Sequence, residues 1–315
     1  MAAPGPRTSL ETVSETQAER ETQTARPSRQ ETAPGAASAS GEDSGARGSR
    51  TVFANILCAV DGTHAGMAAV RMATQLAGPD GHLTLLAVTA VGGSGDYTTA
   101  AISPRRVDRV LSSAKRIADD AGVPSTTLAD PGGPPVKVIL QRASDHDLLA
   151  IGAPATSWLG GMLIGGVTSA ALSQFTTPML VAGRTSAGPL RGRQILVASD
   201  GQEGSDRLVE LAGRLALSQD ADLTLLHAVG SEFEAPPSRI QAQAHALGLT
   251  LPHAGQAWIE QGKAWEVILD AARSRRAAMV IIGSRRLGGL RALGSVSRRV
   301  VHDAPCSVLL LPPEH

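Results

Sequence analysis

The chain repeats itself once, and this internal repeat constrains its fold more than any other feature. Short segments recur in the same order in the two halves, roughly 130–140 residues apart. The paired segments are NILCAVDG at 55–62 with QILVASDG at 194–201, LTLL at 83–86 with LTLL at 223–226, VILQRAS at 138–144 with VILDAARS at 267–274, DLLAIGAP at 147–154 with AMVIIGSR at 278–285, and TPMLVAG at 177–183 with APCSVLLL at 304–311. This period is that of a domain, because solenoid repeats recur every ~20–50 residues. The sequence therefore predicts two copies of one domain.

Each copy alternates short apolar runs with segments of helical periodicity. The apolar residues at helical spacing after the first run are Val70, Ala73 and Ala77 in the first copy and Leu208, Leu211 and Leu215 in the second. Such alternation is typical of βαβ units, which form parallel sheets with right-handed crossovers. We therefore predict an α/β fold: two tandem doubly wound domains, each a five-stranded parallel sheet between helices, after a disordered N-terminal tail.

The first fifty residues differ in composition from the rest. Within 1–50, the large apolar side chains are Met1, Leu10 and Val13, and the remainder is mainly Ala, Gly, Ser, Thr, Pro, Glu and Arg. Such a segment cannot bury enough apolar surface to offset the entropy of ordering it. We predict a disordered, solvated tail, with a regulatory or phosphorylated tail as the alternative.

A second change of composition separates the two copies. The segment RTSAGPLRG at 184–192 is small, polar and contains Pro and Gly, as linkers do. The predicted domains are accordingly 51–184 and 193–315, joined by a linker at 185–192.

Charge and aromatic content exclude several partners. The 29 Lys and Arg residues balance 29 Asp and Glu residues, and aromatic residues make up 2% of the chain. Nucleic-acid and anionic-membrane binding start from an excess of basic charge, and single-strand binding needs aromatic platforms. We therefore expect neither nucleic acid nor a membrane as a partner.

The same composition predicts a cytoplasmic protein. No apolar run approaches the ~18 residues of a membrane span, and the first thirty residues lack the apolar stretch of a secretory signal. Cys58 and Cys306 lie in apolar runs near opposite ends of the chain. We expect both to be reduced core thiols, since a secreted scaffold would carry more cysteines at regular spacing.

An acidic residue follows the first strand of each copy, where a ligand is expected. In a doubly wound sheet, ligands bind beyond the carboxyl ends of the strands, where the winding direction reverses. Asp61 and Asp200 occupy that place and can accept hydrogen bonds from ribose hydroxyls or an adenine amine. The structural alternative, to which we give equal weight, is that each Asp caps the next helix or holds the turn.

A glycine-rich loop follows the fourth strand of each copy, at 152–169 and 283–297. Glycine lets the backbone approach phosphates closely, and the next helix offers free N–H groups to an anion. Thr168, Ser295 and Ser297 either add hydroxyl contacts or cap the helix. The loop is not a Walker A element, because it lacks the Gly-Lys-Ser/Thr ending. A phosphate site and a flexible cover over a domain interface both account for its length.

Taken together, these segments resemble the universal stress protein family in its tandem form, over about residues 53–183 and 191–312. The resemblance rests on the Asp after the first strand, the LLHAV segment at 225–229, the glycine loop and the apolar last strand. It implies a five-stranded parallel sheet between helices. The family divides into ATP binders and non-binders, and the binders carry the pattern G-x2-G-x9-G-[ST].

The first copy keeps this pattern in part. Gly152 and Gly165 have the expected spacing, but Ala155 replaces the second Gly and Gly166 replaces the Ser or Thr. These two departures weigh against ATP binding there.

The second copy departs differently. It keeps Gly294-Ser295, but Arg286 replaces the second Gly and the loop is two residues shorter. The arginines near this loop are Arg285, Arg286, Arg291 and Arg298. They can neutralise phosphates, and a solvated helix face is the alternative. If adenine nucleotide binds, we therefore expect tighter binding in the second copy.

The resemblance implies nucleotide contacts at the ends of the first, second and fourth strands and at the start of the last helix. The candidate binding residues are Asp200, Ala228, Gly283, Arg286, Gly294, Ser295, Val296 and Ser297 in the second copy, and Asp61, Val88, Gly152, Gly165, Gly166 and Thr168 in the first.

The predicted function is that of a non-enzymatic stress-response or regulatory protein that binds ATP or another adenine nucleotide weakly. The alternative is a nucleotide-free protein–protein interaction module with decayed sites. We reject an ATPase or nucleotidyl transferase, which would need metal-holding carboxylates or a general base beside the glycine loop. His64 and His227 lie near the expected site without evident Cys or His partners for a metal, so we predict neither metal nor catalytic residues.

The last strand of each copy is apolar and lies at a sheet edge in this topology, which invites pairing. The resemblance suggests that the strands at 179–182 and 307–311 meet around a pseudo-twofold axis. One chain would then imitate a dimer, and a further homodimer is compatible with the sequence.

Overall fold

The structure is a computed structural model that describes residues 51–89, 102–153, 166–183, 188–230, 237–250, 257–284 and 294–313. The predicted tail at 1–50 lies outside the described residues, as do most of both glycine loops and part of the predicted linker. The domain boundaries predicted from the sequence therefore stay predictions.

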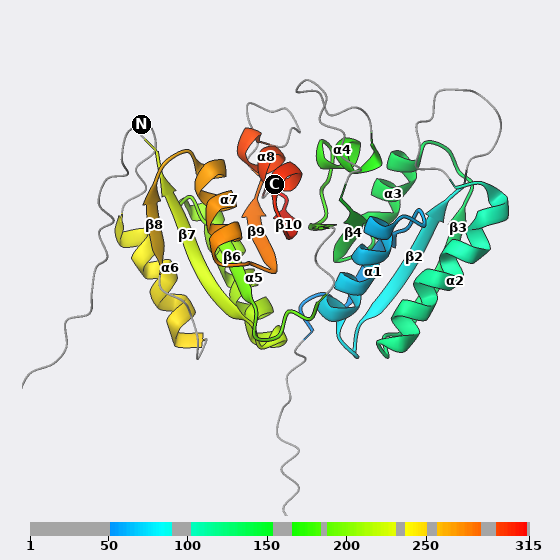
Figure 1. Ribbon diagram of the computed structural model, residues 1–315, viewed down its shortest axis with the longest axis horizontal. Helices are drawn as coiled ribbons and strands as arrows, with labels where there is room; N and C mark the ends of the chain where they lie inside the picture. Colours follow the sequence, from blue (N-terminus) through cyan, green and yellow to red (C-terminus); the bar gives the residue numbers. More distant parts are fainter. Residues whose placement is uncertain are drawn as a thin grey trace, which may run out of the picture. The chain divides into compact units, whose positions relative to one another are not determined.

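Strands and helices alternate along the first half (Figure 1). Its elements are β1 (Asn55–Ala59), α1 (His64–Ala77), β2 (His82–Val88), α2 (Pro104–Asp120), β3 (Ser125–Asp130), α3 (Pro135–Ala143), β4 (Leu148–Gly152), α4 (Val167–Leu172) and β5 (Met179–Ala182).

The second half repeats this order with one addition, a short 3-10 helix before its first α-helix. Its elements are β6 (Gln194–Ala198), η1 (Glu203–Ser205), α5 (Asp206–Gln219), β7 (Asp222–Val229), α6 (Pro237–Thr250), β8 (Trp258–Gln261), α7 (Ala264–Ser274), β9 (Met279–Gly283), α8 (Ser295–Asp303) and β10 (Ser307–Leu311).

Within the described residues, the strands form one sheet in the order β3-β2-β1-β4-β5-β10-β9-β6-β7-β8. All pairs inside each half are parallel. The order reverses direction at β1 and β4 in the first half and at β6 and β9 in the second, as in a doubly wound sheet. The predicted α/β fold of two five-stranded parallel units is thus confirmed.

The two halves are joined through their last strands. β10 pairs with β5 in antiparallel fashion, with Leu309 opposite Leu180. The backbone N–H of Gly183 also donates to the hydroxyl of Ser307, which is fully buried, at 3.2 Å. The antiparallel pair makes one continuous sheet out of the two parallel units.

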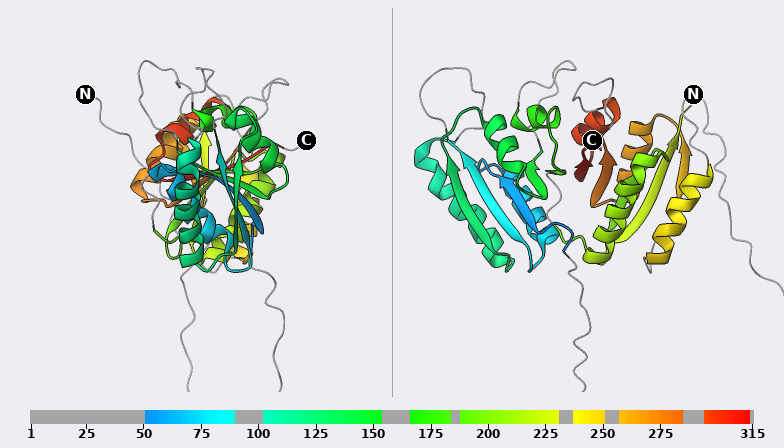
Figure 2. Two further views of the ribbon diagram at one scale, coloured as in Figure 1. Left: turned by 90° about the vertical axis from the view of Figure 1, so that its right-hand side faces the viewer. Right: turned by 180° about the vertical axis from the view of Figure 1, so that it is seen from behind.

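Helices cover both faces of the sheet, which explains the near-continuous apolar strands. Side chains of α1, α2, α5 and α6 pack into the core on one face, and those of α3, α4, α7 and α8 into the core on the other. Figure 2 shows α5 and α6 in front of their strands when the molecule is seen from behind. The helices begin and end where the local sequence directs: Pro stands at the start of α2 and α3, and α1 ends at Gly78 with φ 62°.

Cys58 and Cys306 are buried free thiols, on opposite faces of the sheet. Burial raises the pKa of the Cys58 thiol far above its usual range, and that of Cys306 to about 12. Both side chains therefore act as small core residues, because reactive cysteines need a lowered pKa. No helix in the described part of the chain is long and apolar enough to cross a bilayer.

Candidate functional site

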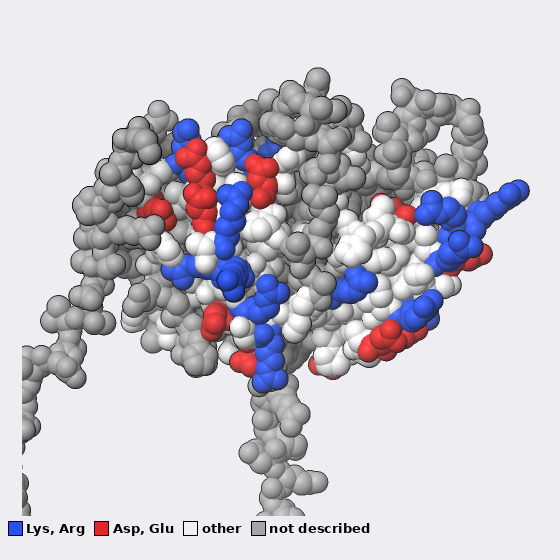
Figure 3. All heavy atoms as spheres, viewed as in Figure 1, with Lys and Arg blue, Asp and Glu red and all other residues white. Residues whose placement is uncertain are grey.

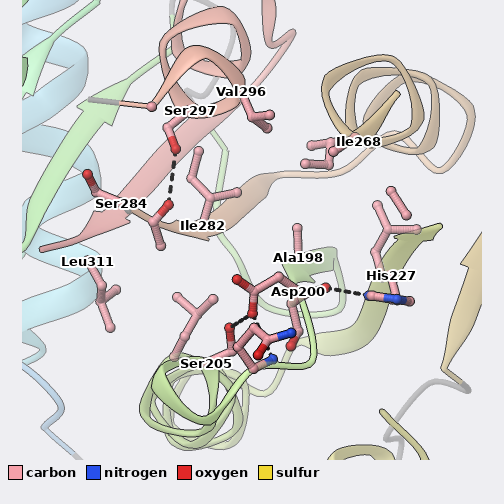
Figure 4. A pocket seen from close by; sticks show the side chains of 18 of the residues that line it. Ala198, Asp200, Ser205, His227, Ile268, Ile282, Ser284, Val296, Ser297 and Leu311 are labelled. Atoms are coloured by element: carbon pink, nitrogen blue, oxygen red, sulfur yellow. Dashed lines mark hydrogen bonds between the residues drawn. The ribbon is translucent and has the colours of Figure 1, made fainter. Parts of the chain in front are cut away.

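A cavity of about 970 Å³ opens at the carboxyl ends of the strands in the second half. It is lined by the ends of β6, β7 and β9, by the starts of α5, α7 and α8, and by residues just beyond β10. Figure 4 shows Ser284 and Ser297 across this cavity from Asp200 and Ser205. The cavity thus lies where the strand order reverses, the usual ligand position in such sheets.

Asp200 organises the loop between β6 and α5. Its Oδ1 accepts a hydrogen bond from the backbone N–H of Gln202 at 2.9 Å and another from the hydroxyl of Ser205. These contacts hold η1 and the start of α5 beside the cavity. The carboxylate therefore holds the turn, which was one of the two roles considered for it from the sequence. Asp200 also lines the cavity.

Asp61 has the same local role in the first half. Its Oδ1 accepts hydrogen bonds from the backbone N–H of Thr63 at 2.9 Å and from its hydroxyl at 2.7 Å. The Thr63 hydroxyl in turn accepts from the N–H of Gly66 at 3.0 Å and caps α1. The first helix therefore begins three residues after Asp61, with no intervening 3-10 turn.

The end of the fourth strand differs between the two copies. A Cβ atom added to Gly152 would lie 2.6 Å from the carbonyl carbon of Ala65 and 2.7 Å from the backbone nitrogen of Gly66. A Cβ atom added to Gly283 would have Leu208 Cδ2 as its nearest neighbour, at 4.0 Å. The first turn of α1 therefore covers the end of β4, whereas the corresponding place in the second copy opens into the cavity.

Two hydroxyls among the candidate binding residues form hydrogen bonds within the protein. The Thr168 hydroxyl donates to the carbonyl of Gly152, and the Ser297 hydroxyl donates to the carbonyl of Gly283, each at 3.0 Å. Each bond ties the start of the last helix to the end of the fourth strand (Figure 4 for Ser297). These side chains fix the helix start, and each hydroxyl oxygen keeps the capacity to accept a hydrogen bond.

The start of α8 is open toward a ligand. Gly294 is its N-cap residue; among the described residues, no side chain caps the helix and no atom lies within 4 Å of where a Cβ of Gly294 would be. The first N–H groups of a helix have no partner within the helix. These groups can bind an anion that enters the cavity.

The cavity brings together most of the residues expected in the second copy. Those that line it are Asp200, Ala228, Gly283, Gly294, Ser295, Val296 and Ser297. Arg286 lies outside the described residues, as does Gly165 of the first copy. In the first copy, Val88 ends β2, Gly152 ends β4, and Gly166 and Thr168 stand at the start of α4.

Two basic residues of the cavity were not expected from the sequence. Among its described lining residues, the basic ones are Arg207 and Lys263. Lys263 is the N-cap residue of α7, and the N-cap residue of the corresponding α3 is Pro134. Arg207 follows Asp200 by seven residues, and the residue seven after Asp61 is Ala68. Aligning the two copies position by position would have revealed both differences.

The described residues show how charged and metal-ligating side chains are distributed. On the face shown in Figure 3, acidic and basic side chains of the described residues are intermixed over both halves. Among the described residues, no three His, Cys, Asp or Glu side chains are placed to hold a metal ion.

Known proteins match both halves of the chain. The sequence profile of the universal stress protein family matches residues 53–183 and again 192–312. A universal stress protein of Thermus aquaticus, described by its position in a QAH/OAS sulfhydrylase 3′ region, is 34% identical over 134 residues, which are 38% of this chain and 98% of that protein. The universal stress protein YxiE of Bacillus subtilis is 30% identical over 145 residues, 38% of this chain and 97% of that protein.

A solved structure matches both halves at once. The crystal structure of a universal stress protein from Archaeoglobus fulgidus covers 84% of this chain and 97% of its own, with a TM-score of 0.67 and 19% identity. At that identity the likeness concerns the fold, and the two profile matches supply the family. The chain belongs to the universal stress protein family, as a member with two such domains in tandem.

Proposed function

We propose that this protein is a non-enzymatic stress-response protein that binds an adenine nucleotide weakly, in the cavity of its second copy. The observation that carries the proposal is the cavity of about 970 Å³ at the carboxyl ends of β6, β7 and β9, beside the uncapped start of α8. Its volume falls within the range of small-molecule sites.

We propose a place in the cavity for each part of the nucleotide. Phosphates would bind the free N–H groups at the start of α8, where Gly294 lets them approach the backbone. Lys263 and Arg207 add positive charge to the cavity. The base and ribose would lie over β6 and β7, near Asp200 and Ala228. Because the loop after β9 is short, a monophosphate or diphosphate fits the proposal as well as ATP.

The two copies would differ in affinity, with the second copy binding more tightly. In the first copy the backbone of Ala65 and Gly66 lies against Gly152. A ligand could reach the end of β4 there only if α1 moved. No such movement is needed beside Gly283.

The proposal includes an intramolecular pseudo-dimer. The antiparallel pairing of β5 with β10 supports it, because Leu180 and Leu309 are both fully buried and lie opposite each other. Each copy would thereby satisfy the exposed strand edge of the other. Association of two whole chains would then use other surfaces.

Two observations favour the alternative, a nucleotide-free interaction module. Asp200 and Ser297 both bond within the protein, and the glycine pattern of the family is incomplete in both copies. A module of this kind would keep the fold without any nucleotide affinity.

A matched pair of glycine substitutions tests the proposal. Gly294 and Gly166 are the N-cap residues of α8 and α4, and an added Cβ meets no atom of the described residues within 4 Å at either place. Gly294→Val should weaken ATP, ADP or AMP binding at least tenfold by blocking approach to the backbone, and Gly166→Val should leave it unchanged. Isothermal titration calorimetry on the full chain measures both. No binding of any of the three nucleotides at millimolar concentration, or equal effects of the two variants, would contradict the proposal.

A further inference from the structure

A layer of buried polar side chains lies under α6 in the second copy. Ser199, His227 and Gln243 are 5%, 4% and 5% exposed. The Ser199 hydroxyl donates to Oε1 of Gln243 at 2.8 Å, and Nδ1 of His227 lies 2.9 Å from the carbonyl oxygen of Ser199. A buried hydrogen bond thus joins α6, through Gln243, to the end of β6.

The first copy has an apolar layer at the same place. The residues that correspond to Ser199 and His227 by strand register are Val60 and Ala87, which are 4% and 0% exposed. The apolar side chains of the covering helix α2 that reach this core are Val107, Val110, Leu111, Ala114 and Ala118. Among its described side chains, α6 contributes only Ile240 and Leu247 to the same core, with Ala244 packed against them. Helix α2 is therefore the better anchored of the two.

Within the described part of the chain, one nitrogen of this layer and one of the neighbouring Arg239 have no hydrogen-bond partner. They are Nε2 of His227 and Nε of Arg239, both shielded from solvent. A buried polar group without a partner destabilises the state that buries it. Opening of α6 would let water bond to both atoms, so this layer lowers the cost of lifting the helix.

The polar layer is continuous with the wall of the cavity. Ser199 and His227 belong to the lining of the cavity, and the Ser199 hydroxyl accepts a hydrogen bond from the N–H of Gly201 at 3.0 Å. Asp206, the first residue of α5, accepts from Gln243 and from Arg239, each at 2.6 Å. The loop that contains Asp200 is thus bonded at both ends to groups that hold α6.

We propose that α6 is a movable cover whose local stability is set by ligand binding in the cavity of the second copy. Without ligand, the incompletely bonded polar layer lets α6 open locally far more often than α2. A nucleotide that fixes the loop from Ser199 to Asp206 strengthens the bonds from this loop to α6 and keeps the helix closed. The second part rests on the proposed nucleotide binding, and the first does not.

Hydrogen exchange of the full chain, followed by mass spectrometry, compares α6 at 237–250 with α2 at 104–120. Without nucleotide, the protected amides of α6 should exchange at least tenfold faster than those of α2, because opening costs less. Equal exchange, or slower exchange in α6, overturns the proposal.

A variant that makes the layer apolar isolates its cause. In Ser199→Val/Gln243→Leu the hydrogen-bonded pair becomes an apolar pair of similar size. Because Gln243→Leu also removes the bond to Asp206, the double variant is compared with Gln243→Leu alone. Exchange of α6 should then slow at least fivefold. As a matched control, Val60→Ser places an unpaired hydroxyl under α2, and exchange of α2 should quicken. Unchanged exchange of α6 in the double variant contradicts the role given to the layer.

The response to ligand is measured by the same hydrogen exchange with ATP added, at a concentration that calorimetry shows to be saturating. Slower exchange of α6, with α2 unchanged, supports the proposal. Binding without any change in α6 overturns the proposed cover and leaves the proposed function intact. Absence of binding overturns the proposed function and with it the response to ligand.

Discussion

The two copies share one fold and differ at the place where a ligand would enter. In the first, α1 begins directly after the turn held by Asp61, and its first turn packs on Gly152. In the second, η1 precedes α5, and the space beside Gly283 belongs to a large cavity. The same order of strands and helices thus supports a closed strand end and an open one. A duplicated domain can therefore keep its core while its two ligand positions diverge.

The largest effect is expected where the copies are alike, at their shared strand pair. Leu180 and Leu309 lie opposite each other and are fully buried, so Lys at either position would bury an unpaired charge. Leu180→Lys and Leu309→Lys should each lower the free energy of unfolding by at least about 3 kcal/mol, measured by urea denaturation. Leu217→Lys is the control, because Leu217 is 56% exposed. A loss in one copy alone would mean that the pair is not shared as described.

The next effect tests the difference between the ends of β4 and β9. Gly152→Ala would place its Cβ within 2.8 Å of the backbone of Ala65 and Gly66, whereas Gly283→Ala meets its nearest neighbour only at 4.0 Å. Overpacking of this kind costs about 1–3 kcal/mol, so Gly152→Ala should destabilise by that amount and Gly283→Ala by much less. Thermal or urea unfolding of the two variants measures it. Equal destabilisation would show that the strand ends are equally closed.

A smaller effect concerns the charge of the cavity. Lys263 lies in the lining, 3.6 Å from Glu266, and the first copy has Pro134 at its place. Lys263→Ala should weaken nucleotide binding by about threefold, since a partly exposed charge contributes up to about 1 kcal/mol. The loss should shrink as salt is raised. Lys137→Ala, on α3 of the first copy, should leave affinity unchanged. Calorimetric titration at two salt concentrations checks each point.

The smallest expected effect is a difference in pH dependence between the outer strands of the two copies, β3 and β8. At the end of β3, hydrogen bonds from Arg142 and from the backbone N–H of Gly132 hold the pKa of Asp130 below its usual range. At β8, Arg275 instead lies over the Trp258 ring, 3.8 Å from its centre. Of these two pairs, only the one at β3 contains a carboxylate, that of Asp130, which gains a proton in acid.

The lowered pKa of Asp130 determines how the stability of the fold changes with pH. Its ionised form stabilises the fold above the ordinary carboxylate pKa, and this stabilisation is lost as pH falls through the lowered one. Asp130→Asn should therefore reduce stability at neutral pH and flatten its decline below about pH 4. Urea unfolding across this pH range measures both. An unchanged acid profile in the variant would contradict the assignment.

The sequence by itself determined the duplicated α/β architecture. The helical spacing of Val70, Ala73 and Ala77 indicates a helix with one apolar face. The apolar runs indicate buried strands, because strands covered on both faces must be apolar throughout. The position of Asp200 after a strand followed from the same pattern. Doubly wound connectivity then placed it at the carboxyl edge of the sheet, where the cavity lies.

Only the tertiary structure revealed the cavity of the second copy and the contact that covers the end of β4 in the first. The contact of Gly152 with Ala65 depends on how α1 leaves its turn, and the bond between Ser199 and Gln243 joins residues 44 positions apart. Lys263 lines the cavity because α7 begins there. Such contacts depend on the distance between packed elements to within an ångström, and residue types and spacing do not encode that distance locally.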